Sequence, residues 1–131
     1  MLHKILIWLD QHLLGFNKVK NGFKEGLHIY AHDNGKMHSR GYYVKGQREG
    51  FWEMFYEDET IMMETQYRSN KTNGLSVSYH KNGKVMMRYT NKMGKIDGIT
   101  EHFNEEGALT SRSLYKDNKK VKELDIDTAI Q

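Results

Sequence analysis

Residues 25–48, EGLHIYAHDNGKMHSRGYYVKGQR, decide the fold, because their pattern returns along the chain with a period of 24 residues. The marker glycines of the successive copies are Gly26, Gly50, Gly74 and Gly98. The residues that follow them directly are all large and apolar, namely Leu27, Phe51, Leu75 and Ile99. Self-similarity at a fixed period is the signature of a repeat protein. We therefore predict four 24-residue units.

Each unit is predicted to contain two strands and two turns. Apolar residues alternate with others over residues 27–31, which is the periodicity of a β-strand. The turn Asp33-Asn34-Gly35 follows, and a second strand runs from about Met37 to Tyr43. The next turn contains Gly46, whose register holds Gly or Asn in every unit, and these residue types adopt the left-handed conformation most easily. The four units therefore predict consecutive β-hairpins.

The second unit departs from this pattern. Glu57-Asp58-Glu59 stands where the other units carry a turn that ends in Gly. A glutamate is strained at positive φ. We therefore expect a different turn at this position.

The fold class that follows is an all-β repeat protein, an elongated antiparallel β-meander of hairpins with an N-terminal α-helical cap. Residues 1–15 are predicted to form an amphipathic capping helix, residues 16–121 the hairpin units, and residues 122–131 a tail or closing strand. The apolar stripe of the helix is Leu2, Ile5, Leu6, Leu9 and Leu13, with Gly15 as its C-cap. The alternative role of this helix is to engage a partner or a membrane surface.

Composition limits the function classes. The 131 residues include no Cys, and 20 Lys and Arg are interspersed with 17 Asp and Glu, giving a net charge of +3. Disulfides and thiolate chemistry are excluded, and a nucleic-acid partner is disfavoured, because no concentrated basic patch stands out. The N-terminal apolar run is too short to cross a bilayer. We expect a cytoplasmic protein without a transmembrane segment, whose open sheet edges allow self-association.

Each unit begins with a Gly that is followed by an apolar residue, and an aromatic residue comes four positions later. A second Gly, a Tyr and a turn with Asn or Gly complete the unit. This pattern resembles the MORN repeat. It is most similar to the variant class of bacterial and phage proteins described as antitoxin-like. The resemblance covers about residues 16–121. It implies a scaffold that binds, inhibits or neutralises a partner protein and performs no chemistry.

The alternation of side chains along a strand predicts which residues form the core and which form the outer face. In the first strand of each unit, the parity that contains Leu27, Phe51, Leu75 and Ile99 is predicted to be the buried core. The opposite parity is rich in aromatic and His residues, which are typical interface anchors. The candidate partner-binding residues on that face are His28, Tyr30, His32, Trp52, Met54, Tyr56, His80 and His102. The same face could instead pack internally.

A second surface is a row of arginines that shares one register of the second strands, with Glu64 in the second unit. Together with the C-terminal lysines it is the alternative site, for an anionic polymer such as nucleic acid or a phosphoinositide lipid. Its residues are Arg40, Arg88, Arg112, Lys116, Lys119 and Lys120. The competing interpretation is a solvated row neutralised by neighbouring carboxylates. No catalytic motif is present, so we predict no enzyme activity, no cofactor and no metal.

Overall fold

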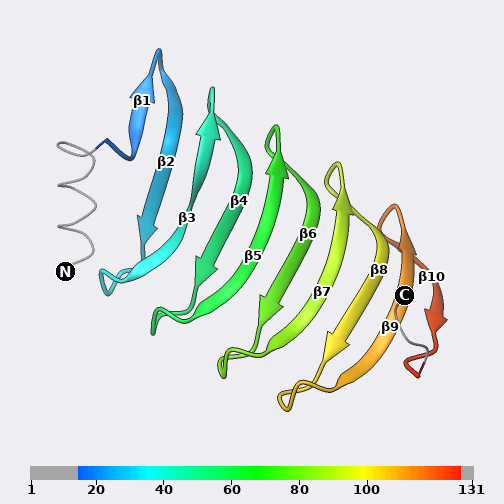
Figure 1. Cartoon of the computed structure of the whole chain (residues 1–131). Helices are drawn as coiled ribbons and strands as arrows, with labels where there is room; N and C mark the ends of the chain where they lie inside the picture. Colours follow the sequence, from blue (N-terminus) through cyan, green and yellow to red (C-terminus); the bar gives the residue numbers. More distant parts are fainter. Residues whose placement is uncertain (1–14, 128–131) are drawn as a thin grey trace.

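The computed structural model describes residues 15–127, which form a single antiparallel sheet whose ten strands are paired in sequence order (Figure 1). The strands are β1 (Lys18–Lys20), β2 (Phe23–Ala31), β3 (Met37–Val44), β4 (Gln47–Phe55), β5 (Ile61–Arg68), β6 (Lys71–Tyr79), β7 (Val85–Lys92), β8 (Lys95–Phe103), β9 (Leu109–Lys116) and β10 (Lys119–Leu124). The predicted all-β meander is confirmed. The predicted capping helix lies almost wholly outside the described residues.

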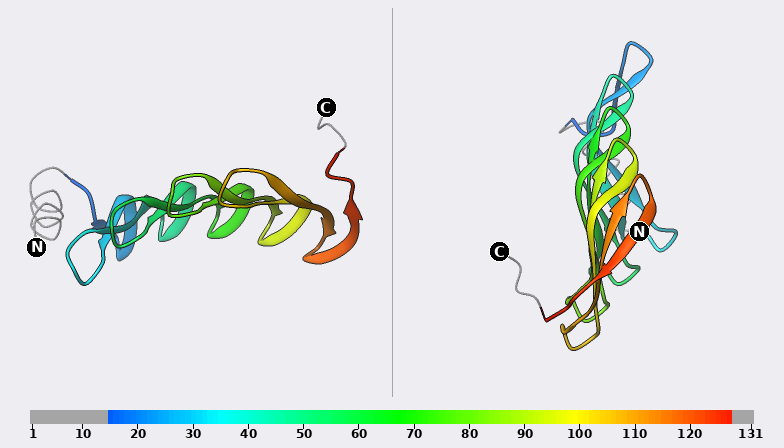
Figure 2. Two further views of the ribbon diagram at one scale, coloured as in Figure 1. Left: turned by 90° about the horizontal axis from the view of Figure 1, so that it is seen from below. Right: turned by 90° about the vertical axis from the view of Figure 1, so that its right-hand side faces the viewer.

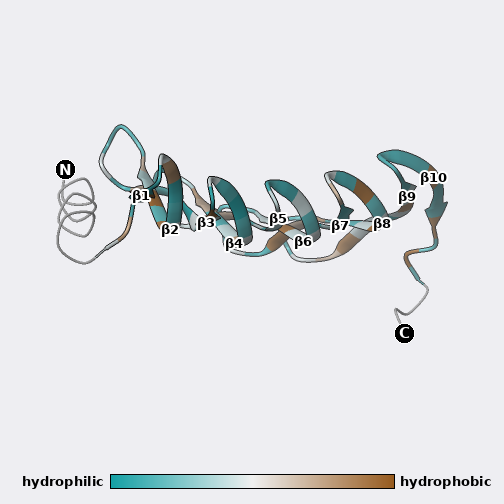
Figure 3. Ribbon diagram, turned by 90° about the horizontal axis from the view of Figure 1, so that it is seen from above, coloured by the Kyte–Doolittle hydropathy of each residue, from teal (hydrophilic) through white to brown (hydrophobic). Residues whose placement is uncertain are grey.

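The sheet is one elongated, twisted layer with curved strands, and its first and last strands lie at opposite ends (Figure 2). Within residues 15–127 no second layer covers either face, so the apolar interior is thin. Of these residues, Trp52 alone is a hydrophobic residue of the buried class. Hydrophobic segments are scattered along the ribbon among hydrophilic ones (Figure 3). A single layer with a thin interior needs few apolar residues, in agreement with the hydrophobic content of 37%.

Tight two-residue turns join β1 to β2, β3 to β4 and each later pair at the same end of the sheet. Both central residues of each turn have positive φ, for example 50° at Lys45 and 80° at Gly46. This is the type I′ geometry, which matches the twist of the flanking strands. The prediction of left-handed Gly or Asn in this register is confirmed, with φ of 80°, 69°, 88° and 68° at Gly46, Asn70, Gly94 and Asn118.

The longer turns at the other end share one conformation, and the expectation of a different turn at Glu59 is wrong. Glu59 has φ of 71°, close to the 84° and 89° of Gly35 and Gly83. Its N–H donates to the Tyr56 carbonyl at 2.9 Å, the bond that Gly35 makes to the carbonyl of His32. The Asp58 carboxylate also accepts from the Thr60 N–H at 3.0 Å. These bonds hold the glutamate in its strained conformation.

Replacing Glu59 by Gly is expected to raise the free energy of unfolding by about 0.5–1 kcal/mol. The left-handed conformation costs an L-residue about 1–2 kcal/mol, and glycine returns part of this through its larger loss of chain entropy. Urea denaturation of the two proteins measures the difference. The reverse change at the matching position, Gly83→Glu, should lower stability by a similar amount. A lower midpoint for Glu59→Gly would show that the side chain contributes more than the strain costs.

The cross-strand pairs define two faces. The packed face carries, in its central row, His28, Gly41, Trp52, Thr65, Ser76, Tyr89, Thr100 and Ser113. The stripe face carries, in the corresponding row, Leu27, Tyr42, Phe51, Gln66, Leu75, Thr90, Ile99 and Leu114.

The predicted parity of burial is wrong. Phe51, Leu75 and Ile99 of the expected core are 63%, 43% and 38% exposed, whereas Trp52 is 6% exposed and Ser76 is inaccessible. The physical reason is the single layer. Without a second layer, side chains are buried only where their own neighbours close over them, and in the two central rows this happens on the packed face, where Gly, Ser and Thr leave room. In the part of the chain that the structure describes, nothing lies above the large apolar residues of the opposite row, and they protrude.

Candidate functional site

The structure places the predicted partner-binding residues partly on the packed face and partly at the start of the longer turns. His28 and Trp52 are buried in the central row of the packed face, and Tyr30 and Met54 are half-buried beside them. His102 is exposed on the same face. The remaining three, His32, Tyr56 and His80, lie where the longer turns begin and are half-buried.

Trp52 is the centre of an aromatic cluster. Its ring meets Tyr43 edge-on at 5.1 Å between centroids, and it lies 6.2 Å from Tyr67 and 6.5 Å from Tyr30. The indole N–H donates to the Tyr42 carbonyl at 3.2 Å. The ring rests on Gly41, where any side chain would overlap it. Trp52 therefore anchors the packed face and is not available as a surface anchor in this fold.

The side chains that begin the longer turns connect neighbouring hairpins. The Nε2–H of His32 donates to the Phe55 carbonyl at 3.0 Å, and that of His80 donates to the Phe103 carbonyl at the same distance. The Tyr56 hydroxyl donates to the Tyr79 carbonyl at 2.7 Å. These bonds satisfy backbone acceptors of the next hairpin, so the three residues have a structural role.

The residues directly before the marker glycines make a second set of hydrogen bonds between neighbouring hairpins. The sequence shows an Asp, Asn or Glu in this register but not the bonds that it makes. Their side-chain oxygens accept from backbone N–H groups of the next tight turn. The pairs are Glu25 with Lys45 at 2.7 Å, Glu49 with Ser69 at 2.8 Å, Asn73 with Met93 at 3.0 Å and Asp97 with Asp117 at 3.4 Å. Both sets of connections tie each hairpin to the next and stiffen the sheet along its length.

The burial of His28 affects the protonation of its imidazole. Burial holds the pKa of its imidazole below the usual 6.5, the positive charge of Lys24 lowers it further, and the hydrogen bond to the Gly26 carbonyl partly opposes both. The folded protein therefore binds fewer protons than the unfolded chain near pH 6. The contribution of neutral His28 is complete above the unfolded pKa and is lost as pH falls through the folded pKa.

Stability is accordingly expected to fall between about pH 7 and about pH 5, with a smaller fall in a His28→Gln variant. The measurement is the urea midpoint as a function of pH. His102→Gln is the control, because His102 is exposed, and it should keep the slope of the parent protein. Equal slopes in all three proteins would remove His28 as the cause.

The predicted arginine row lies on the stripe face, beside the row of Phe51, and its guanidinium groups are already paired. Arg40 meets Glu53 at 2.9 Å. Arg88 and Arg112 both meet Glu101, at 2.8 and 3.5 Å. The arrangement is the one described by the interpretation of a row neutralised by carboxylates, and binding of an anionic polymer stays a prediction.

The predicted lysines of the alternative site are exposed at the far end of the sheet. Lys116 pairs with Asp97 at 3.3 Å, and this hydrogen bond holds the pKa of the Asp97 carboxyl below its usual range. Lys120 pairs with Glu123. Lys119 and Lys120 belong to β10, which pairs with β9 and ends at Leu124, so it includes only the first three residues of the predicted tail or closing strand, 122–131.

The stripe face is the surface that the sequence reasoning assigned to the core. Two hollows lie along it, one lined by Leu27, Tyr42 and Phe51, the other by Leu75, Thr90 and Ile99. The paired arginines and glutamates line the same hollows. The sequence contains one sign of this face, which is the apolar residue after every marker glycine. The residue in this register is Leu, Phe or Ile, so its shape changes from unit to unit.

Neither a metal-binding cluster nor a membrane-spanning helix occurs among the described residues. Across residues 15–127, no three His, Asp or Glu side chains gather closely enough to hold a metal ion. The described part of the chain also has no helix with the length and apolar character needed to cross a membrane.

Comparison with known proteins does not show a family. No family model matches the chain, and no curated protein matches it. A crystal structure of TarM aligns with a TM-score of 0.48 and 16% sequence identity, over 88% of this chain and 23% of that chain. The chain thus spans about a quarter of the length of that protein. The resemblance to the MORN repeat remains a prediction.

Proposed function

We propose that the protein is a non-enzymatic, MORN-like protein-binding module of four 24-residue hairpin units, and that it holds its partner on the stripe face. The observation that supports this most is the row of exposed apolar side chains on alternate strands, Phe51 on β4, Leu75 on β6 and Ile99 on β8. A regular row of exposed apolar side chains gives a partner protein apolar area to remove from water. The paired charges beside it supply a polar rim.

The partner chemistry follows from this geometry. Alternate strands of a sheet lie about 9.6 Å apart, so the stripe presents an apolar side chain at about that interval. A partner surface with apolar side chains at the same interval would bury the whole row. The hydrogen bonds between hairpins keep the row in place before binding, which reduces the entropy lost on association. Blocking a partner in this way, as an inhibitor or antitoxin-like neutraliser, requires no chemistry.

Paired surface variants test the proposal. The tagged full chain, a Leu75→Ser/Ile99→Ser variant and a Val19→Ser/Met93→Ser variant would each be used to capture proteins from the native cell, with identification by mass spectrometry. The control pair removes two exposed apolar side chains away from the stripe. A partner that the parent and the control retain, and the stripe variant loses, supports the proposal. Equal retention by both variants contradicts it, and retention that disappears steeply with salt would instead favour the lysines of β10.

A further inference from the structure

The strand ends at the tight turns carry pairs of like charges. At three successive hairpins, from β5 to β10, two basic residues stand directly opposite each other on adjacent strands. The pairs are Arg68 with Lys71, Lys92 with Lys95 and Lys116 with Lys119. Like charges in opposite positions destabilise a sheet. The fold gains nothing from this repeated arrangement, so it points to a role in binding.

These six residues, here called the basic rail, lie in one row on the stripe face. Their members on β5, β7 and β9 each stand two positions beyond a stripe-face residue of the same strand, as Lys92 does beyond Thr90, and therefore share its face. The residues opposite them lie on the same face. All six are exposed. With adjacent strands about 4.8 Å apart, the rail extends over about 24 Å along the tight-turn end of the sheet.

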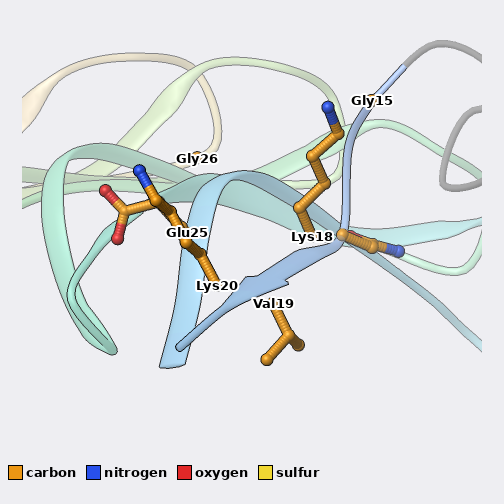
Figure 4. Close-up of a pocket in the computed structure, with 7 residues that line it drawn as sticks. Gly15, Lys18, Val19, Lys20, Glu25 and Gly26 are labelled. Atoms are coloured by element: carbon orange, nitrogen blue, oxygen red, sulfur yellow. The ribbon is translucent and has the colours of Figure 1, made fainter. Parts of the chain in front are cut away.

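The first two hairpins do not continue the rail. Their opposite pairs are Lys20 with Phe23 and Val44 with Gln47. Figure 4 shows Lys20 and Glu25 projecting to the same side of the ribbon, so the one cation of these two pairs has a carboxylate on its side. The rail is therefore confined to β5–β10, the strands that also carry Leu75 and Ile99.

Carboxylates of the described residues leave most of the rail unpaired. Within residues 15–127, Lys116 is the one rail residue in an ion pair, with Asp97 at 3.3 Å. Asn73 accepts from the N–H of Met93, next to Lys92, and its amide carries no charge. The rail thus presents a line of positive charge to whatever protein surface lies above it.

The rail runs beside the exposed apolar side chains of the stripe face. Lys71 and Leu75 lie on β6, and Lys95 and Ile99 lie on β8, four residues apart in each case, which is about 13 Å along a strand. The flexible four-carbon stem of each lysine can cover part of this distance. A partner that covers Leu75 and Ile99 therefore brings its neighbouring surface within reach of the rail.

The surroundings of the rail favour a protein over a single-stranded nucleic acid. Nucleic-acid strands are held by basic groups together with aromatic side chains on which the bases stack. From β5 to β9, the central row of the stripe face contains no aromatic ring and consists of Gln66, Leu75, Thr90, Ile99 and Leu114. Apolar groups beside unpaired cations match a protein surface on which carboxylates border apolar side chains.

We propose that the basic rail binds carboxylates of the partner protein, and that the partner carries an acidic row beside the apolar side chains that meet Leu75 and Ile99. The inference rests on the proposed function, because the stripe face supplies the apolar contact. Complementary charges speed the encounter and fix the orientation of the partner. The sequence did not reveal the rail, because its residues are dispersed along the chain and the meander brings them together.

Two synthetic peptides of about 20 residues, or about 30 Å as helices, test the proposal. Both carry a stripe of Leu, a common way for a helix to dock on an apolar surface. One has a row of Glu to one side of the stripe, and its twin has Gln at the same positions. Fluorescence anisotropy gives their affinities for the full chain at about 50 mM salt, where screening is weak.

We expect the parent protein to bind the Glu peptide about tenfold more tightly than the Gln peptide. The rail variant Lys71→Gln/Lys92→Gln/Lys95→Gln should bind both peptides equally, and it should fold, because it removes repulsion between opposite residues. The matched control is Lys36→Gln/Lys81→Gln/Lys84→Gln, which removes the same charge from exposed positions of the longer turns. This control should keep the preference for the Glu peptide.

Equal affinity of the parent for the two peptides, a preference that the rail variant keeps, or a preference that the control loses would overturn the proposal. Tighter binding of an oligothymidylate of about 20 nucleotides than of the Glu peptide, lost in the rail variant, would also overturn it and assign the rail to nucleic acid.

The Leu75→Ser/Ile99→Ser variant separates this inference from the proposed function. If the stripe face is not a binding surface, this variant binds the Gln peptide as the parent does, whatever the preference for Glu. If the rail does not bind carboxylates, the variant loses affinity for the Gln peptide while the parent shows no preference between the peptides.

Discussion

Substituting Gly41 by Ala is expected to lower the free energy of unfolding by about 3 kcal/mol, because no room exists for one more carbon atom. A Cβ at this position would overlap the Cδ2 and Cε2 atoms of Trp52, which belong to the fused centre of the indole. Movement of the ring is opposed by its contacts with Tyr30, Tyr43 and Tyr67 and by its hydrogen bond to the Tyr42 carbonyl. Urea or thermal denaturation measures the loss.

A double-mutant cycle with Trp52→Ala separates this overlap from other effects of the extra methyl group. Trp52→Ala alone is expected to cost about 3–5 kcal/mol, because it empties the centre of the aromatic cluster. In that background Gly41→Ala should be nearly neutral, which gives a coupling energy of about 2–3 kcal/mol. Additive losses would show that Gly41 is needed for a reason other than the indole.

Glu101→Gln is expected to lower stability by about 3 kcal/mol through the loss of the carboxylate shared by Arg88 and Arg112. The side chains of Glu101 and Arg112 are 8% and 7% exposed, so the buried positive charge of Arg112 would lose the Glu101 carboxylate. The Asp125 carbonyl, which accepts from the Arg112 Nη1 at 3.4 Å, would remain but carries no charge. Breaking a buried pair from one side is costly because the remaining charge cannot regain its hydration. The measurement is the urea midpoint of the purified variant.

Glu53→Gln is the matched control for this pair. It removes the carboxylate that faces Arg40, in the same row of the same face, but the side chains of Arg40 and Glu53 are 44% and 31% exposed. Exposed ion pairs contribute at most about 1 kcal/mol. Similar losses of unfolding free energy in Glu101→Gln and Glu53→Gln would mean that burial does not determine how much each ion pair contributes to stability. That result would contradict the role given to Glu101.

The period of the sequence was sufficient to predict the meander and its tight turns. Left-handed residues leave a direct mark, because only Gly, Asn and a few others adopt that conformation without strain. Glu59 shows the limit of this reasoning. The bond that its N–H donates to the Tyr56 carbonyl, and the bond that the Thr60 N–H donates to the Asp58 carboxylate, hold the glutamate in a conformation that its own preference opposes. Local preference predicts a turn well only where tertiary bonds do not override it.

Burial could not be predicted from alternation, because a period of two gives two faces without saying which one is covered. Phe51 and Trp52 are neighbours, and hydrophobicity alone ranks both as core residues. Their environments differ because Trp52 faces Gly41 and Phe51 faces Gln66 across the adjacent strands. The hydrogen bonds between hairpins could not be predicted from the sequence either. His32 and Tyr56 occupy the same register and both donate to a carbonyl of the next hairpin, but their side chains differ and their acceptors are backbone atoms.

The stripe face is the functional surface only if the sheet turns Leu75 and Ile99 to solvent and Trp52 inward. Hydroxyl-radical labelling of the native full chain, read at residue level by mass spectrometry, tests this orientation directly. We expect labelling of Leu75 and Ile99 and protection of Trp52, with protection lost on denaturation in urea. Labelling of Trp52 in the native protein at its denatured rate, with Leu75 and Ile99 protected, would contradict the orientation and the binding surface built on it.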